Sequence, residues 1–242
     1  MIANPSPDSA PAAAFQQTRW SLVGAARAGD DALGALTVLC RDYAYPVYAY
    51  VRRSGHAPEA AHAVCRAFFA RLAHALREVD PRAHGRFRTF LLAQLTQFLA
   101  TDWSDTPADD APLPDLPLAQ LEARHRHEAA RAATPAQGFE RGFALELLAR
   151  GMRQLRNEAA QGGRLELFER LEPYLSREPG PGEHALIERD TGLRPLVCVV
   201  AIRRLRQRFR ELIDAELSET VASDQDLEAE RDTLLSILGG NR

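Results

Sequence analysis

The sequence has no lysine and only 3 cysteines, and no apolar run in it is long enough to cross a bilayer. Its 30 positive side chains are all arginine, which we attribute to a GC-rich genome more than to function. The cysteines, Cys40, Cys65 and Cys198, are odd in number and widely spaced. This argues against a disulfide framework or a zinc site and favours buried free thiols in a reducing compartment. Residues 1–14 lack the charged and apolar regions of a secretory signal, so we expect a cytoplasmic protein with no membrane partner.

Signatures of catalysis are also missing. The sequence contains no glycine-rich phosphate loop, and no serine, histidine and acidic residue stand in the setting of a nucleophile elbow. Its 7 histidines include His125 and His127, but neighbours two apart on a helix point in different directions, and no cysteine or aspartate stands at ligand spacing. We therefore expect no enzyme, no metal site and no cofactor.

Apolar residues recur at intervals of three and four through most of the chain, and no convincing alternating run appears, which predicts an all-α fold. Two mildly basic blocks are separated and followed by acidic segments, so the charge permits nucleic-acid binding without demanding it. We expect two small helical domains joined by a flexible linker, the second domain carrying a helix-turn-helix. The expected parts are a disordered N-terminus at 1–14, a helical domain at 15–103, an acidic proline-rich linker at 104–133, the helix-turn-helix domain at 134–217 and an acidic helical tail at 218–242.

Prolines and capping residues set the expected helix boundaries. Pro46 should bend or break a helix at 31–51, and Thr134, Pro135 and Gln137 form a capping box that opens a helix in the second domain. The other expected helices cover 18–27, 58–78, 87–103, 118–133 (a loosely held polar helix), 164–175 and 223–238.

The most informative stretch is Arg203–Arg210, in which five of eight residues are arginine. It follows an expected short helix at Glu183–Asp190, a turn at Thr191–Leu193, and Pro195 where a second helix would begin. This pattern is typical of a helix-turn-helix that binds DNA. Arginine stems that pack beside the apolar stripe of the same helix, with their charged ends in water, would give the same spacing. The spacing alone leaves both interpretations open.

Further stretches carry a likeness to a known family, and they keep their order from residue 15 to nearly the C-terminus. They are Phe15–Val23, Tyr45–Arg53, Phe68–Leu72, Gly85–Leu92, Thr134–Pro135 and Arg203–Ile213. Together with two helical modules and an arginine-rich helix-turn-helix, these stretches resemble bacterial RNA polymerase sigma factors of the sigma-70 family, extracytoplasmic-function type, as a divergent member.

The resemblance implies a transcription initiation factor whose partners are RNA polymerase core and promoter DNA. In such factors the first module binds the polymerase clamp and captures the melted −10 element, and the second module recognises the −35 element. Carried over by position, the implied contacts are Arg86, Arg88 and Gln97 at the −10 element; Arg194, Arg203, Arg204, Arg206 and Arg208 at the −35 element; and Glu59, His62 and Arg66 at the polymerase.

Three departures from the family's pattern fall on these contact surfaces. After Glu59 the chain carries alanine, histidine and arginine where the family carries acidic residues, which predicts weak polymerase binding. Acidic residues follow the −10 helix at 102–110 and would repel phosphates. Val199 stands where relatives carry a basic or polar residue, and an apolar side chain cannot read base edges by hydrogen bonds. The alternative is therefore a degenerate sigma-like adaptor that binds a protein partner without promoter recognition. Control by an anti-sigma protein, by a kinase or by the acidic tail stays open.

Overall fold

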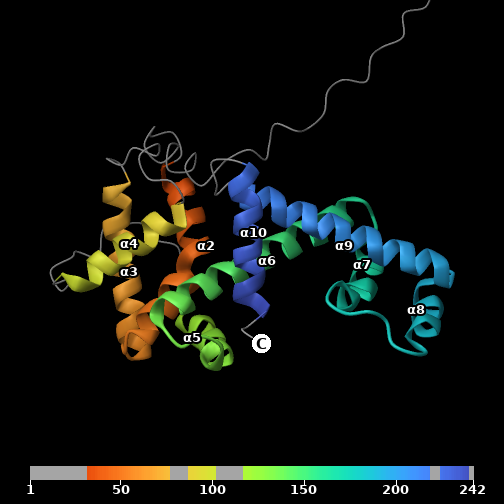
Figure 1. Ribbon diagram of the computed structural model, residues 1–242, viewed down its shortest axis with the longest axis horizontal. Coiled ribbons are helices and arrows are strands. Elements are labelled where there is room, and N and C mark those ends of the chain that lie inside the picture. The colour runs from red at the N-terminus through yellow and green to blue at the C-terminus, as the bar shows by residue number, and fades with distance from the viewer. Residues whose placement is uncertain (1–31, 77–86, 102–116, 219–223, 240–242) are drawn as a thin grey trace, which may run out of the picture.

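The structure is a computed structural model, and it describes residues 32–76, 87–101, 117–218 and 224–239. Every regular element in these ranges is helical, which confirms the all-α prediction (Figure 1). The expected N-terminal segment at 1–14, the expected helix at 18–27 and the acidic stretch at 104–116 lie outside the described residues. None of the helices in the described ranges is both long and apolar enough to span a bilayer.

The elements follow the order predicted from the sequence. The described α-helices are α2 (Ala32–Arg53), α3 (Pro58–Ala75), α4 (Phe87–Ala100), α5 (Leu118–Glu128), α6 (Pro135–Gln161), α7 (Leu165–Leu171), α8 (Glu183–Thr191), α9 (Pro195–Ser218) and α10 (Asp224–Gly239). The 3-10 helices η2 (Ala129–Arg131) and η3 (Glu172–Leu175) follow α5 and α7.

The predicted capping box at the start of α6 is confirmed. The Gln137 backbone N–H donates to the Thr134 hydroxyl at 3.2 Å, and the Gln137 side-chain oxygen accepts from the Thr134 backbone N–H at 3.1 Å. At Pro46, by contrast, α2 continues as one helix without a break. Most of its residues between Leu39 and Val51 are buried, and tertiary packing of this kind outweighs one missing backbone donor.

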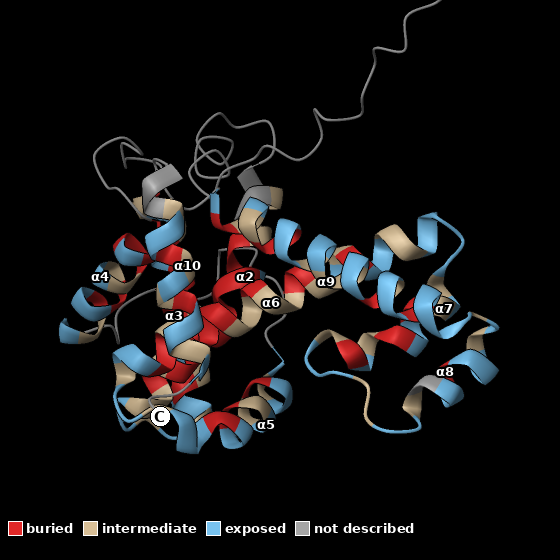
Figure 2. Cartoon of the chain, turned by 45° about the vertical axis from the view of Figure 1, so that its right-hand side comes forward, coloured by how far each residue is buried: buried red, intermediate tan, exposed pale blue. Residues whose placement is uncertain are grey.

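The largest hydrophobic core is built around α2. The ring of Tyr43 lies 5.4 Å from that of Phe87 on α4, edge to face, and is stacked 6.0 Å from that of Phe143 on α6. Leu217 of α9 and Leu234 of α10 are buried in the same core, so segments far apart in the sequence share it (Figure 2). Helix α6, which the sequence assigns to the second domain, is therefore part of this core, and the two-domain division stays a prediction.

Two glycines let α6 approach α2 closely. A Cβ atom on Gly142 would lie 2.9 Å from the Cα atom of Pro46, and one on Gly138 would lie 2.5 Å from the side chain of Arg53. Because the two glycines stand four residues apart, they share one face of α6. At Gly142 an added Cβ would meet the backbone of α2, so the crossing of these helices depends on this glycine, whereas at Gly138 it would displace the side chain of Arg53.

The described part of the expected linker is a docked helix. Leu121 of α5 is buried in the main core, and Glu122 accepts hydrogen bonds from the Tyr48 hydroxyl at 2.7 Å and from Arg52 at 2.9 and 3.1 Å. The Arg52 guanidinium, and then the Tyr48 hydroxyl, hold the pKa of the Glu122 carboxyl at about 2. The sequence indicated only a loosely held polar helix here. Much of the contact that fixes α5 is made by charged and polar side chains such as Glu122, and such contacts do not appear as a periodic pattern of apolar residues.

The far half of α6 belongs to the helical unit that carries the predicted helix-turn-helix. Leu155 of α6, Phe168 of α7 and Leu212 of α9 form a small core of their own. An ion pair between Arg150 of α6 and Glu216 of α9, at 2.7 Å, also connects the two long helices. Helix α6 thus runs from the main core to α7 and α9 without interruption (Figure 1).

Candidate nucleic-acid interface

Helices α8 and α9 are joined by the predicted turn. Gly192 ends α8 with a φ of 69°, a left-handed conformation that favours glycine. The Thr191 hydroxyl donates to the Ile187 carbonyl at 2.6 Å and accepts from the Leu193 backbone N–H at 3.2 Å, which fixes the turn. Helix α9 then begins at Pro195, where the missing N–H has no partner to lose.

A compact core positions α9 against α8. Cys198 and Ile202 of α9 are buried with Ile187 of α8, and Leu171 of α7 and Tyr174 of η3 complete the cluster. These residues take one side of the first half of α9. The opposite side of α9 faces solvent and carries Leu196, Val199, Val200, Arg203 and Gln207 (Figure 2).

The arginine row is divided by this packing, and Arg206 points inward. Its guanidinium donates to the Tyr174 carbonyl at 2.9 and 2.7 Å and to the Arg177 carbonyl at 2.6 Å, and it also pairs with Glu178. These carbonyls lie at the end of η3 and just after it. Arg206 therefore stabilises the turn before α8, and in this conformation it is not available to a duplex.

Arg208 is also engaged within the chain. It forms two hydrogen bonds with the Glu158 carboxylate of α6, at 2.8 and 2.7 Å, and one with Glu211 at 3.1 Å. The Arg208 guanidinium lowers the pKa of the Glu158 carboxyl, and it lowers that of Glu211 as well. The Arg208 side chain is half exposed, so a phosphate could reach it. Binding the phosphate would require Arg208 to give up its pair with Glu158.

Three predicted DNA contacts remain on the surface. Arg194, Arg203 and Arg204 are exposed, and no hydrogen bond or ion pair joins the guanidinium of any of them to another described residue. Arg204 also lines a pocket of about 260 Å³ between α6, α7 and α9. These three guanidiniums, here called the free arginines, are exposed cations that α9 and its preceding turn offer to an anionic partner.

An apolar patch adjoins the free arginines. Leu196 is 79% exposed, and Val197, Val199 and Val200 on the same first two turns of α9 are about half exposed, as is Leu186 on α8. The exposed position of Val199 agrees with the departure noted in the sequence. Leucine and valine side chains can pack against an apolar partner surface, and they cannot donate hydrogen bonds to base edges.

Of the three residues implied at the −10 element, the structure describes two, Arg88 and Gln97, and they differ in exposure. Arg86 lies outside the described residues, and Gln97 is exposed on α4. Arg88, in the first turn of α4, is buried and pairs with Glu140 of α6 at 2.6 Å and with Glu230 of α10 at 2.9 Å. Its guanidinium also lies over the ring of Phe143, 5.3 Å from the centroid. In this conformation Arg88 cannot reach nucleic acid.

The residues implied at the polymerase lie along α3. Glu59 is exposed in the first turn, and His62 and Arg66 follow it half-buried on the same helix. The buried side of α3 is apolar and includes Val64, Phe68 and Leu72. Glu59 is the single acidic residue of α3. The weak polymerase binding expected from this lack of carboxylates stays a prediction.

Sequence reasoning missed the two carboxylates that hold Arg88. The sequence places Glu230 in an acidic tail, but this residue stands three residues after Leu227 and four before Leu234. All three positions fall on one face of α10. A carboxylate inside an apolar edge was the available signal that the tail docks and that Glu230 has a buried cationic partner.

The cysteines and acidic side chains form no further site in the described ranges. Cys40, Cys65 and Cys198 are buried free thiols, as predicted, and burial raises the pKa of Cys40 to about 12. Among the described residues no group of three or more histidine, cysteine, aspartate or glutamate side chains could hold a metal ion.

The chain was also compared with known proteins. No protein-family model, no curated protein and no solved structure matches it.

Proposed function

We propose that this protein is a transcription initiation factor of the sigma type, which directs RNA polymerase core to promoters. The first helical module would capture the −10 element, and the helix-turn-helix of α8 and α9 would recognise the −35 element. The observation that carries the proposal is the exposure of the free arginines Arg194, Arg203 and Arg204 on this helix-turn-helix, without internal partners. The ordered sequence resemblance described above supports the same assignment.

The chemistry of these arginines suits DNA. A guanidinium attracts phosphates at any sequence and can donate two hydrogen bonds to the major-groove edge of guanine. Because the whole chain has a net charge of −3, attraction to DNA must be local to such a surface. Binding through a few arginines should therefore weaken steeply as salt is added.

In-vitro transcription tests the proposal directly. The assay combines purified core polymerase, the full chain and DNA from upstream of the gene's own operon, and it compares the wild type with Arg203→Ala/Arg204→Ala. Arg153→Ala/Arg170→Ala is the matched control, because it removes two exposed arginines that lie on α6 and α7. We expect a specific transcript that the first double substitution lowers and the control keeps. No transcript at any salt concentration would refute the proposal.

A second function is favoured by the apolar patch next to the free arginines. Leu196, Val199 and Val200 occupy the part of α9 that would enter the major groove, and exposed apolar side chains there suit a protein surface better than base edges. On this alternative the chain is a sigma-like adaptor. It would bind core polymerase or a regulator in a pull-down and yield no transcript, and Leu196→Ala would weaken that binding.

A further inference from the structure

The acidic C-terminal helix α10 lies across α6 and α9 (Figure 1). Leu234 is buried in the main core, and Leu227, Ile237 and Leu238 pack against that core half-buried. The docked face of α10 is therefore mainly apolar. This apolar contact helps to hold an acidic helix on the body of the protein.

A buried carboxylate interrupts that apolar face. Glu230 is only 1% exposed, and its carboxylate lies 2.9 Å from the Arg88 guanidinium at the start of α4. Glu140 of α6 occupies the other side of the same guanidinium at 2.6 Å. The Arg88 side chain is only 7% exposed. Two carboxylates thus surround one cation, and α10 supplies the one that lies 142 positions away in the sequence.

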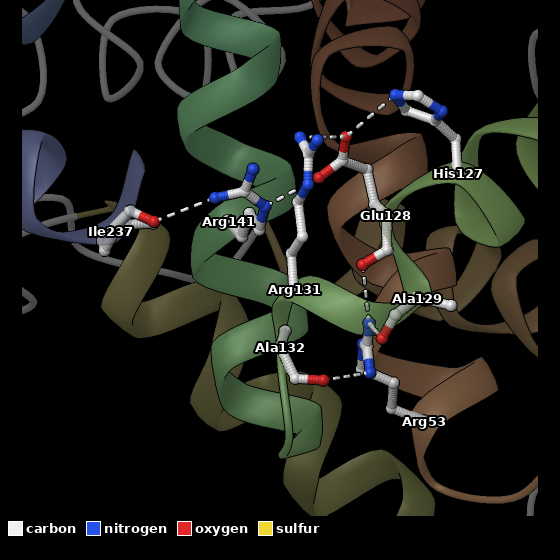
Figure 3. Close-up of polar contacts among 8 residues, drawn as sticks. All are labelled: Arg53, His127, Glu128, Ala129, Arg131, Ala132, Arg141 and Ile237. Carbon is white, nitrogen blue, oxygen red and sulfur yellow. Dashed lines mark hydrogen bonds and ion pairs between the residues drawn. The ribbon is translucent and has the colours of Figure 1, made fainter. Parts of the chain in front are cut away.

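Polar contacts fix α10 at other points as well. Arg141 of α6 donates to the Ile237 carbonyl in the last turn of α10 at 3.0 Å and pairs with Glu128 of α5 at 2.7 Å (Figure 3). A cation at this end of a helix is favoured by the helix dipole. Arg231 of α10 pairs with Asp214 of α9 at 2.9 Å. Helix α10 is therefore joined to α4, α6 and α9 by polar and apolar contacts.

We infer that α10 is an intramolecular latch, which masks Arg88 and keeps the start of α4 from nucleic acid until α10 is displaced. The inference rests on the proposed function, because the sequence resemblance assigns Arg88 to the −10 element. Glu230 acts twice: it pairs with the guanidinium, and its own charge opposes an approaching phosphate. Displacement of α10 would remove both effects and leave Arg88 with Glu140 alone.

The test uses Glu230→Gln in the full chain, with Glu228→Gln as the matched control. Glu228 is exposed on the same helix, so both variants lose one acidic charge, but only the first loses the partner of Arg88. Phenylglyoxal modification of Arg88, followed by peptide mass spectrometry, measures unmasking without DNA. Fluorescence anisotropy with a short mixed-sequence single-stranded DNA, over a range of salt concentrations, measures the effect on binding.

We expect Glu230→Gln to speed the modification of Arg88 and to tighten DNA binding, with the slope of log K against log salt steeper by about one, as for one added phosphate contact. The control should change neither. In an Arg88→Gln background, Glu230→Gln should give no gain in DNA binding. Leu234→Ala keeps both charges and loosens the apolar contact of α10, so it should also speed the modification of Arg88.

Two results would overturn the latch. Unchanged modification of Arg88 in both Glu230→Gln and Leu234→Ala would mean that α10 does not control access to it. Faster modification with no gain in DNA binding would mean that Arg88 is masked for structural reasons only. Neither result depends on Arg203 or Arg204, so failure of the latch is distinguishable from failure of the proposed function in the transcription assay.

Discussion

Arg206→Ala should destabilise the protein, whereas Arg203→Ala, three residues away on the same helix, should not. The Arg206 side chain is 21% exposed and joins α9 to the carbonyls of Tyr174 and Arg177 at the end of η3. Removing it leaves these carbonyls without their charged donor. Arg203 is exposed and makes no such contact with the described residues.

The magnitude follows from the contacts. A hydrogen bond to a charged group contributes about 1.5–3 kcal/mol, but the three bonds to carbonyls share one guanidinium and water can reach part of it. The ion pair with Glu178 adds little, because that carboxylate is mostly exposed. We expect Arg206→Ala to lower the free energy of unfolding by about 2–3 kcal/mol. Arg203→Ala should stay within about 0.5 kcal/mol of the wild type.

Thermal unfolding followed by circular dichroism measures the difference. For a chain of this length the expected loss corresponds to a fall in Tm of roughly 4–12 °C for Arg206→Ala. Arg206→Lys should recover little of it, because an ammonium group cannot reproduce the planar fork that reaches both carbonyls. If Arg206→Ala and Arg203→Ala unfold at the same temperature, the division of the arginine row into structural and free members is wrong.

Three further outcomes are expected. Gly142→Ala should lower the free energy of unfolding by about 1–3 kcal/mol, since its Cβ would meet the backbone of α2. Gly151→Ala should cost less in urea titrations, because its Cβ would meet the end of the Ile213 side chain and not backbone. The Glu122 carboxylate should stabilise the fold fully above pH 4.5 and lose this effect gradually as the pH falls toward 2, so most of the Tm advantage of wild type over Glu122→Gln should remain at pH 4 and most of it should be lost near pH 2; an advantage already lost at pH 4 would contradict the low pKa of Glu122. Arg203→Ala/Arg204→Ala should flatten the salt dependence of duplex binding by about two in log–log slope, and an unchanged slope would remove both residues from the DNA surface.

Local signals in the sequence predicted the local structure well. The capping box at Thr134, the turn at Gly192 and the start of α9 at Pro195 all follow from side-chain chemistry within a few residues. Apolar spacing predicted a helix at 58–78 for the same reason, and α3 covers Pro58–Ala75. Such features are decided by neighbours along the chain, which a sequence displays.

The partners of each helix could not be predicted in the same way. The spacing of Arg206 and Arg203 is equally consistent with solvent, carbonyls or phosphate, and only the position of η3 decides between them. The family resemblance assigns Arg88 to DNA, and the carboxylates that pair with it in the structure, Glu140 and Glu230, are far away in the sequence. Contacts between distant segments are set by tertiary packing, and even where a pattern signals a buried partner, as at Glu230, it does not say which residue the partner is.

Helix α6 makes the two ends of the molecule sensitive to insertions and deletions. Its 27 residues extend for roughly 40 Å, and each added residue would rotate everything beyond it by about 100°. A single insertion between Gly142 and Gly151 would turn the α9-facing side away from α9 while the α2-facing side stayed in place. Viable length changes in this helix should therefore come in steps of about seven residues, which complete two turns and restore the phase.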